Sequence, residues 1–99
     1  MKYGLTYTAQ FRRDYKRIKK RKFNISELQA VVTMLAEGKT LPETYRDHAL
    51  FGYRRNAREC HIRPDWLLIY SISNETIVLE LLRTGSHSDL FLYWAHRQP

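Results

Sequence analysis

The chain is poor in cysteine, and this shortage removes two kinds of chemistry. The single cysteine, Cys60, has no partner for an internal disulfide and cannot supply a multi-thiolate zinc site. No stretch reaches the roughly 18 consecutive apolar residues that a membrane span needs, and no apolar leader segment is recognisable. We therefore expect no disulfide, no membrane span and no export, which is consistent with a cytoplasmic location.

Acidic residues are also scarce. The chain has 10 Asp and Glu against 17 Lys and Arg, which gives a formal net charge of +7. A basic excess of this size favours a polyanionic partner, either nucleic acid or an acidic protein, and no long basic amphipathic helix indicates a membrane surface. Apolar residues make up 43% of the chain and aromatic residues 13%, so a folded domain is expected.

The 99 residues are enough for one domain, and their apolar spacing predicts its elements. We expect a strand at 2–7, helices at 8–22 and 24–37, a loop at 39–52, and strands near 53–62, 66–72 and 76–83. A short helix from Ser86 completes the order β-α-α-β-β-β-α. Three consecutive strands with short turns form an antiparallel meander. The expected class is therefore α+β, with both N-terminal helices on one face of a small, mainly antiparallel sheet.

The central feature is the stretch 61–70, in which polar residues precede an apolar run. Pro64 marks a turn, and the residues from Trp66 onward are typical of a strand buried on both faces. The meander brings the end of one strand, the start of the next and the end of the last to one rim of the sheet. We expect four residues to converge there: His61, Asp65, Arg83 and His87. His48 joins them only if its loop folds back.

Such a cluster has the side chains that metal-free RNA cleavage requires. The reaction needs a base for the ribose 2′-OH, an acid for the departing 5′ oxygen, and a cation to stabilise charge at phosphorus. Histidine, with a pKa of about 6.5, can act as acid or base near neutral pH. Arginine binds phosphate oxygens through two N–H groups, and Trp66, Tyr70 and Phe91 are candidates for stacking on a base.

Other interpretations of the same residues stay open at this stage. Each histidine could be a surface or core residue, Asp65 a simple turn residue, and Trp66 and Phe91 members of the core. A transition metal could instead be ligated by His48, His61, Asp65 and His87, although no short HxxxH-type spacing supports this. The residues alone indicate a basic α+β domain with a candidate histidine-rich site.

The sequence resembles YafQ-type toxins of the RelE/ParE superfamily in three blocks: YRDHAL at 45–50, RECHIRPDWLLIY at 58–70 and LRTGSHSDLF at 82–91. The resemblance covers nearly the whole chain, and three ordered blocks at compatible spacing are more specific than any one block. It implies a RelE-like fold, in which two N-terminal helices and a short C-terminal helix accompany a small sheet. Residues 92–99 extend past the length expected for this group.

The resemblance also implies a function: a toxin of a type II toxin–antitoxin system that cleaves mRNA in the ribosomal A site without a metal or other cofactor. Trp66 and Phe91 would place the substrate, and Arg83 would contact the scissile phosphate. The implied acid–base group is His48, His61, Asp65 and His87. The expected partners are a cognate antitoxin and the ribosome with its A-site mRNA, with rRNA contacts through the basic helix 8–22.

Two other functions remain open beside this one. A ParE-like protein would inhibit DNA gyrase without nuclease activity, and a basic RNA-binding module would bind RNA without catalysis. The predicted histidine-rich rim favours the nuclease over the gyrase inhibitor, because a gyrase-directed protein does not need three histidines and an aspartate in one place. In the RNA-binding module the histidines would be structural.

Overall fold

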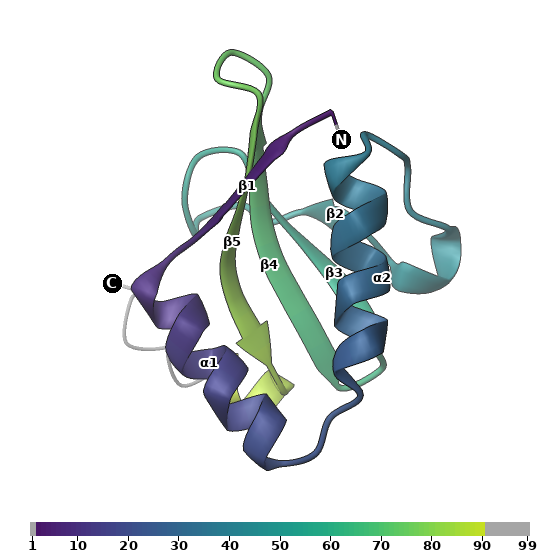
Figure 1. Cartoon of the computed structure of the whole chain (residues 1–99), viewed down its shortest axis with the longest axis vertical. Coiled ribbons are helices and arrows are strands. Elements are labelled where there is room, and N and C mark those ends of the chain that lie inside the picture. Colours follow the sequence, from purple (N-terminus) through teal and green to yellow (C-terminus); the bar gives the residue numbers. More distant parts are fainter. Residues whose placement is uncertain (1, 91–99) are drawn as a thin grey trace.

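A computed structural model describes residues 2–90, which form one sheet accompanied by two helices (Figure 1). The elements in chain order are β1 (Gly4–Tyr7), α1 (Ala9–Lys20), α2 (Ile25–Ala36), the 3₁₀ helix η1 (Glu43–Tyr45), β2 (His48–Ala49), β3 (Ala57–Arg63), β4 (Trp66–Ser73) and β5 (Val78–Gly85). The sheet order is β1-β5-β4-β3-β2, with β1 parallel to β5 and the other neighbours antiparallel. The α+β class and the meander are confirmed, and residues 87–90 are helical as expected after Ser86.

Local sequence explains where both helices begin and end. The side chains of Thr8 and Asn24 each accept a first-turn backbone N–H, at 2.9 and 3.1 Å, which confirms both predicted caps. At the other ends, Lys22 (φ 62°) and Gly38 (φ 77°) adopt the left-handed conformation. This lets the following N–H groups bond back to the last helical turn. The two helices are thus joined by the short link expected from the sequence.

Several element boundaries differ from the sequence expectation, and backbone turns explain the later starts of β3 and β5. β3 begins at Ala57 rather than near 53, because the preceding residues form turns that end with Asn56 at φ 61°. β5 begins at Val78 rather than 76, since the turn before it continues to Ile77 at φ 57°, and β5 extends through Gly85 rather than ending at 83. The expected loop at 39–52 is wrong in part, because it contains η1 and the two-residue strand β2.

Side chains alternate between the two faces of the sheet, and the helices cover one of them (Figure 1). Trp66, Leu68 and Tyr70 of β4 pack with residues of α1 and α2 in the main core. Their neighbours Leu67 and Ile69 point to the opposite face, where they belong to a second, smaller apolar cluster. The opposite face is therefore where polar side chains can remain accessible.

A buried carboxylate of α1 binds the outer edge of β5. β1 pairs with β5 only as far as Leu81, so the backbone of β5 needs other partners beyond that point. Asp14, which is 0% exposed, accepts the backbone N–H of Thr84 (3.2 Å). Its carboxylate also binds Arg83 through Nε (2.7 Å) and a terminal nitrogen (3.0 Å). These contacts replace part of the strand ladder and tie α1 to the end of β5.

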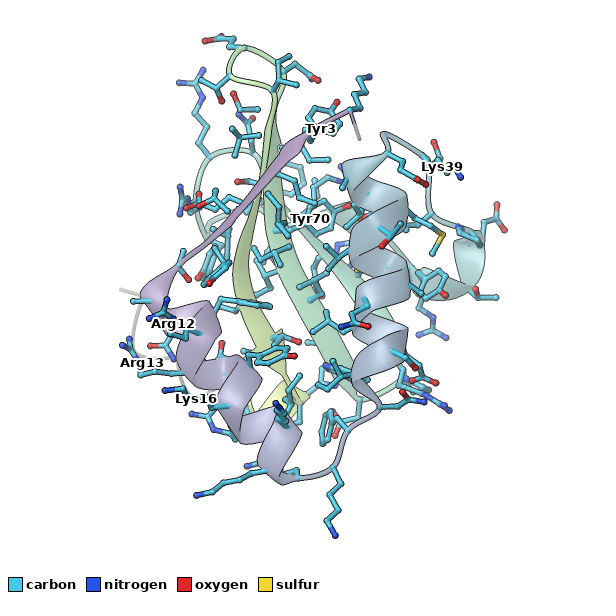
Figure 2. All side chains as sticks on the ribbon, in the orientation of Figure 1. Tyr3, Arg12, Arg13, Lys16, Lys39 and Tyr70 are labelled. Carbon is cyan, nitrogen blue, oxygen red and sulfur yellow. The ribbon has the colours of Figure 1, made fainter. Side chains whose placement is uncertain are left out.

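The basic residues of α1 lie on its outer side. Figure 2 shows Arg12, Arg13 and Lys16 pointing away from the sheet, and all three are exposed. The apolar stripe of the helix, with Phe11 and Ile18, is buried instead. Neither helix in residues 2–90 has the length and apolarity needed to cross a bilayer.

Replacement of Asp14 by Ala should destabilise the fold far more than loss of a surface ion pair. The change removes a carboxylate from the buried Arg83 guanidinium and the acceptor of the Thr84 N–H, so we expect the free energy of unfolding to fall by about 3–5 kcal/mol. Urea unfolding measures it. The control is Glu37→Ala, because Glu37 pairs with Lys39 at the surface (3.1 Å). A loss below about 1 kcal/mol for Asp14→Ala, the range of surface pairs, contradicts this role.

Candidate active site

The four residues predicted to form the acid–base group lie in a row at one end of the sheet. The ring centroids of His48 and His61 are 6.4 Å apart, and those of His61 and His87 are 5.7 Å apart. Asp65 contacts His87 at the end of the row. The row crosses β2, the end of β3 and the segment after β5. The predicted convergence is observed for His61, Asp65 and His87 but not for Arg83, which is buried against Asp14. His48 reaches the row because its loop folds back as β2.

This row lies on the sheet face opposite to the helices. Glu59 and His61 pair with β4 residues that point away from the helices, and His48 pairs directly with Glu59. The side chain of His61 is 15% exposed, whereas His48 and His87 are 51% and 55% exposed. The site is therefore an open surface with a half-buried imidazole at its centre.

Asp65 and His87 form a hydrogen-bonded pair from two different segments. Asp65 lies in the tight turn between β3 and β4, and one of its oxygens accepts the backbone N–H of His87 (2.9 Å). The same oxygen lies 2.6 Å from Nδ1 of His87. The backbone bond and then the ring bond hold the pKa of Asp65 below its ordinary value. An ionised Asp65 keeps the hydrogen on Nδ1, which leaves Nε2 of His87 to exchange a proton with a substrate.

The segment that carries His87 is held in place by a reciprocal cap. The Ser86 N–H donates to the Asp89 carboxylate (3.0 Å), and the Asp89 N–H donates to Ser86 Oγ (3.2 Å). Arg21, at the end of α1, also donates to Asp89 (2.9 Å). Gly85 leaves room for this arrangement, since a Cβ there would lie 2.9 Å from Asp89 Oδ2. The position of His87 thus depends on α1 as well as on β5.

Glu59 is a further member of the site, although no sequence pattern singled it out. Its carboxylate lies 3.3 Å from Nε2 of His48 and 3.9 Å from Nε2 of His61, and its side chain is 17% exposed. Side chains two residues apart in a strand lie on the same face of the sheet. The location of Glu59 two residues before His61 was therefore the sequence signal that could have identified it. The site therefore holds two carboxylate–imidazole groups, one on each side of His61.

Asp47 anchors the short strand that carries His48. Adjacent residues of an extended chain point to opposite sides, so Asp47 turns toward the main core while His48 turns toward the site. The Asp47 carboxylate accepts the Tyr70 hydroxyl (2.5 Å) and a terminal N–H of Arg58 (3.1 Å). Tyr70 lies in the interior in Figure 2 and is 1% exposed. Burial, and then the Asp47 charge, raises the pKa of its hydroxyl, so it remains a donor.

Two of the three residues expected to contact substrate are core residues instead. Trp66 is 3% exposed, because its side of β4 faces the helices, and its ring packs edge-on against Phe23 with centroids 5.0 Å apart. Arg83 is also 3% exposed, and its guanidinium faces Asp14 rather than the open surface. Phe91, the third residue, lies outside the residues that the structure describes.

Within the described range, a set of side chains with metal-ligand geometry is His48, Glu59 and His61, whose ligand atoms all lie within 4.8 Å of one another. This set differs from the alternative drawn from the sequence. Glu59 takes the place of Asp65 and His87, whose ligand atoms do not belong to this group. Two imidazoles and one carboxylate are donors that suit transition metals.

Comparison with known proteins agrees with the sequence resemblance. Residues 3–92 match the family model described as the bacterial toxin of type II toxin–antitoxin system, YafQ. The mRNA interferase toxin YafQ of Escherichia coli K12 is 35% identical over 88 residues, covering 88% of this chain and 94% of that protein. A putative toxin YafQ of Haemophilus influenzae is 37% identical over 93 residues, covering 89% and 91%.

The fold is likewise similar to solved structures. A chain of the crystal structure of the E. coli DinJ–YafQ complex matches with a TM-score of 0.83 at 34% identity, covering 90% of this chain and 98% of that chain. A metal-bound toxin from Helicobacter pylori matches with a TM-score of 0.85 at 39% identity, covering 90% and 99%. The expected RelE-like architecture is thus confirmed by both sequence and fold.

Replacement of Tyr70 by Phe should loosen β2 while the core keeps its packing. The ring remains, but Asp47 loses its hydroxyl donor, and a hydrogen bond to a charged group contributes about 1.5–3 kcal/mol. We expect amide hydrogen exchange at residues 48–50, followed by NMR, to accelerate at least about tenfold. The control is Tyr3→Phe, because the buried Tyr3 hydroxyl donates to a side chain of the β4–β5 turn (2.7 Å). Equal exchange at residues 48–50 in both variants contradicts the anchoring role.

Proposed function

Because the chain belongs to the YafQ family of bacterial type II toxins, we propose that it is an mRNA interferase that cleaves mRNA in the ribosomal A site and so stops translation. The proposal is carried by the convergence of three imidazoles and two carboxylates on one exposed sheet face: His48, Glu59, His61, Asp65 and His87. Translating ribosomes are cytoplasmic, so the protein would act in the cytoplasm.

The proposed reaction is attack of a ribose 2′ oxygen on the adjacent phosphorus. A base removes the 2′-OH proton while the bond from the 2′ oxygen to phosphorus forms. The bond from phosphorus to the 5′ oxygen breaks, and an acid gives that departing oxygen a proton. The products are a 2′,3′-cyclic phosphate and a 5′-hydroxyl. No metal ion is needed for any of these transfers.

Two proton-handling groups on either side of His61 would share the acid and base roles. In one, the ionised Asp65 orients the imidazole of His87. In the other, Glu59 lies beside His48. The central His61 can donate an N–H to a phosphate oxygen as negative charge develops there. Its ring centroid is 6.4 and 5.7 Å from those of the flanking histidines, so all three imidazoles are close enough to contact one phosphodiester lying over the row.

Arg83 and Trp66 would act beneath the site rather than on the substrate. Arg83 binds Asp14 and so holds the end of β5, after which His87 follows. The Trp66 Nε1 donates to Thr84 Oγ1 (2.9 Å), and that hydroxyl donates to the Leu67 carbonyl (2.8 Å). Both residues thereby fix the strand ends on which the proton-transfer groups are mounted.

The ribosome would be contacted through the basic residues of α1. Its exposed Arg12, Arg13 and Lys16 lie on the outer side of the helix, as Figure 2 shows. Lysine and arginine contacts with phosphates supply affinity without sequence preference, which suits binding to rRNA. The catalytic row lies on the other face of the sheet, so mRNA and rRNA would be held by separate surfaces.

A cognate antitoxin would be the protein partner, as in the DinJ–YafQ complex to which this chain is similar. An apolar groove runs between α1, α2 and β1 and is lined by side chains that include Phe11, Leu28 and Val32. Leu5 and Tyr7 beside it are about half exposed, at 49% and 50%. With basic residues along α1, this groove suits an apolar segment that also carries acidic residues.

Replacement of Asp65 by Asn should slow cleavage of ribosome-bound mRNA about 10²–10⁴-fold with little change in stability. Asn keeps the carbonyl that accepts the His87 N–H but lacks the charge that keeps the hydrogen on Nδ1. Primer extension on mRNA from an in vitro translation reaction measures the rate. The chelator TPEN, which removes transition metals and leaves Mg²⁺ for the ribosome, should not lower the wild-type rate.

The matched control is Glu37→Gln, an acid-to-amide change at an exposed position outside the site. Gyrase inhibition or RNA binding without catalysis would need no proton transfer by His87 and therefore no charge on Asp65. A rate within about twofold of wild type for Asp65→Asn, or no cleavage by wild type, would therefore count against the proposed nuclease.

A further inference from the structure

Glu59 lies between two imidazoles and has no permanently charged partner in the described part of the chain. The groups within ion-pair distance of its carboxylate are Nε2 of His48 (3.3 Å) and Nε2 of His61 (3.9 Å). Both carry a positive charge only when protonated. A carboxylate that is only 17% exposed is stabilised by a cation, so this position attracts one.

A contact with a backbone carbonyl shows which ring nitrogen of His48 carries the hydrogen. The other ring nitrogen, which faces Glu59, then has a free lone pair. Nδ1 lies 3.1 Å from the carbonyl oxygen of Ala49. A carbonyl oxygen only accepts, so Nδ1 must carry the hydrogen. In neutral His48, Nε2 then presents a lone pair to the Glu59 carboxylate at 3.3 Å. The contact becomes attractive only when a proton or a metal ion lies between the two atoms.

The same arrangement is what a metal-ligating histidine requires. Such a histidine commonly donates its other ring N–H to a backbone carbonyl, which fixes the tautomer and the ring orientation. Tetrahedral zinc with bonds of about 2.0–2.1 Å needs ligand atoms roughly 3.3 Å apart. The three ligand atoms here lie within 4.8 Å of one another, and His48 is half exposed on an edge strand of two residues. A small rotation of that side chain closes the difference.

His61 is available to such an ion through one nitrogen. Its Nδ1 is buried and has no hydrogen-bond partner among residues 2–90. Its Nε2 faces Glu59, so the lone pair that would bind an ion points toward Glu59 and His48. His87 is not part of the set, because the side chains whose ligand atoms lie within 4.8 Å of one another are His48, Glu59 and His61.

We propose that His48, Glu59 and His61 bind one divalent transition-metal ion, of the class of Zn²⁺, Ni²⁺ or Cu²⁺, and that the bound ion blocks RNA cleavage. Two imidazoles with one carboxylate select these metals over Mg²⁺ and Ca²⁺, which prefer oxygen ligands alone. The block follows because the ion occupies the nitrogen and oxygen atoms that would exchange protons. This second part rests on the proposed nuclease function, whereas the binding itself does not.

Isothermal titration calorimetry of the full chain with ZnCl₂ tests the binding. We expect one ion per chain, at least about tenfold weaker binding for Glu59→Gln and for His48→Ala, and no comparable binding of Mg²⁺. Asp65→Asn is the matched control, because it changes a carboxylate of the same rim outside the ligand set, and it should bind Zn²⁺ like wild type. The absence of saturable binding, or equal binding by Glu59→Gln, overturns the site.

NMR locates the ion independently of affinity. The ring resonances of His48 and His61 should shift on addition of Zn²⁺ in proportion to occupancy, while those of His87 should shift little. Larger shifts at His87 than at His48 would place the ion elsewhere and overturn the assignment. This measurement needs neither RNA nor ribosomes, so it also separates a failed site from a failed nuclease.

The effect on activity is tested with ribosome-bound mRNA. Saturating Zn²⁺ should suppress cleavage by wild type at least about tenfold, and excess TPEN should restore it. Unchanged or faster cleavage with Zn²⁺ bound contradicts the block while leaving the binding site intact. Absence of cleavage both with and without Zn²⁺ contradicts the proposed nuclease instead, and the calorimetry then stands alone.

Discussion

The buried contact of Asp14 with Arg83 and the Thr84 N–H determines where β5 ends and what lies beside it. β1 stops pairing at Leu81, so without Asp14 the last residues of β5 would present an open edge inside the protein. The contact joins α1 to that edge across 69 residues of sequence. From this fixed end the chain turns at Gly85 and delivers His87 to Asp65. The row of His48, His61 and His87 is therefore held in part by a buried ion pair that does not reach the exposed face.

Because side chains alternate between the two faces of a strand, the residues that hold the candidate site and the residues that form it lie on opposite faces of the sheet. Asp47 faces the main core, where Tyr70 and Arg58 hold it, and the next residue, His48, faces the site. β4 does the same on a larger scale, since one side of the strand fills the helix-covered core and the other lies under the site. Each exposed residue of the candidate site is thus adjacent in sequence or in the sheet to a buried residue that fixes it.

Glu59 gives the site a second possible occupant besides RNA. The carboxylate and its two imidazoles form a place where either a proton or a metal ion makes the contacts favourable. Catalysis by proton transfer needs the first of these, and a resident ion would remove it. Under the proposed function, the same three side chains would take part in the reaction and, with an ion bound, would prevent it.

Sequence patterns predicted the α+β order, both helix caps and the convergence of His61, Asp65 and His87, because these depend on local spacing and on the reversals of a meander. Patterns could not predict the burial of Asp14. On α1 it is one acid among many bases, and its partner lies 69 residues away.

The same limit applies to Glu59 and Arg83, which have an ordinary strand context in the sequence. Whether such a residue faces the core, the edge or the site depends on register and on the irregularity between Ile69 and Tyr70. Those features follow from how the strands and helices pack. The spacing of apolar residues in the sequence therefore does not predict the register or the irregularity.

The most direct test of the account is the chemical nature of the RNA ends produced by the wild-type chain on ribosome-bound mRNA, determined by mass spectrometry in the presence of TPEN. Attack by the 2′ oxygen predicts a 2′,3′-cyclic phosphate on the upstream fragment and a 5′-hydroxyl on the downstream one. A 2′-deoxy nucleotide at the cleavage position should then abolish the products. Fragments that end in a 3′-hydroxyl and a 5′-phosphate, or cleavage that persists at the 2′-deoxy position, would contradict proton transfer by this histidine row.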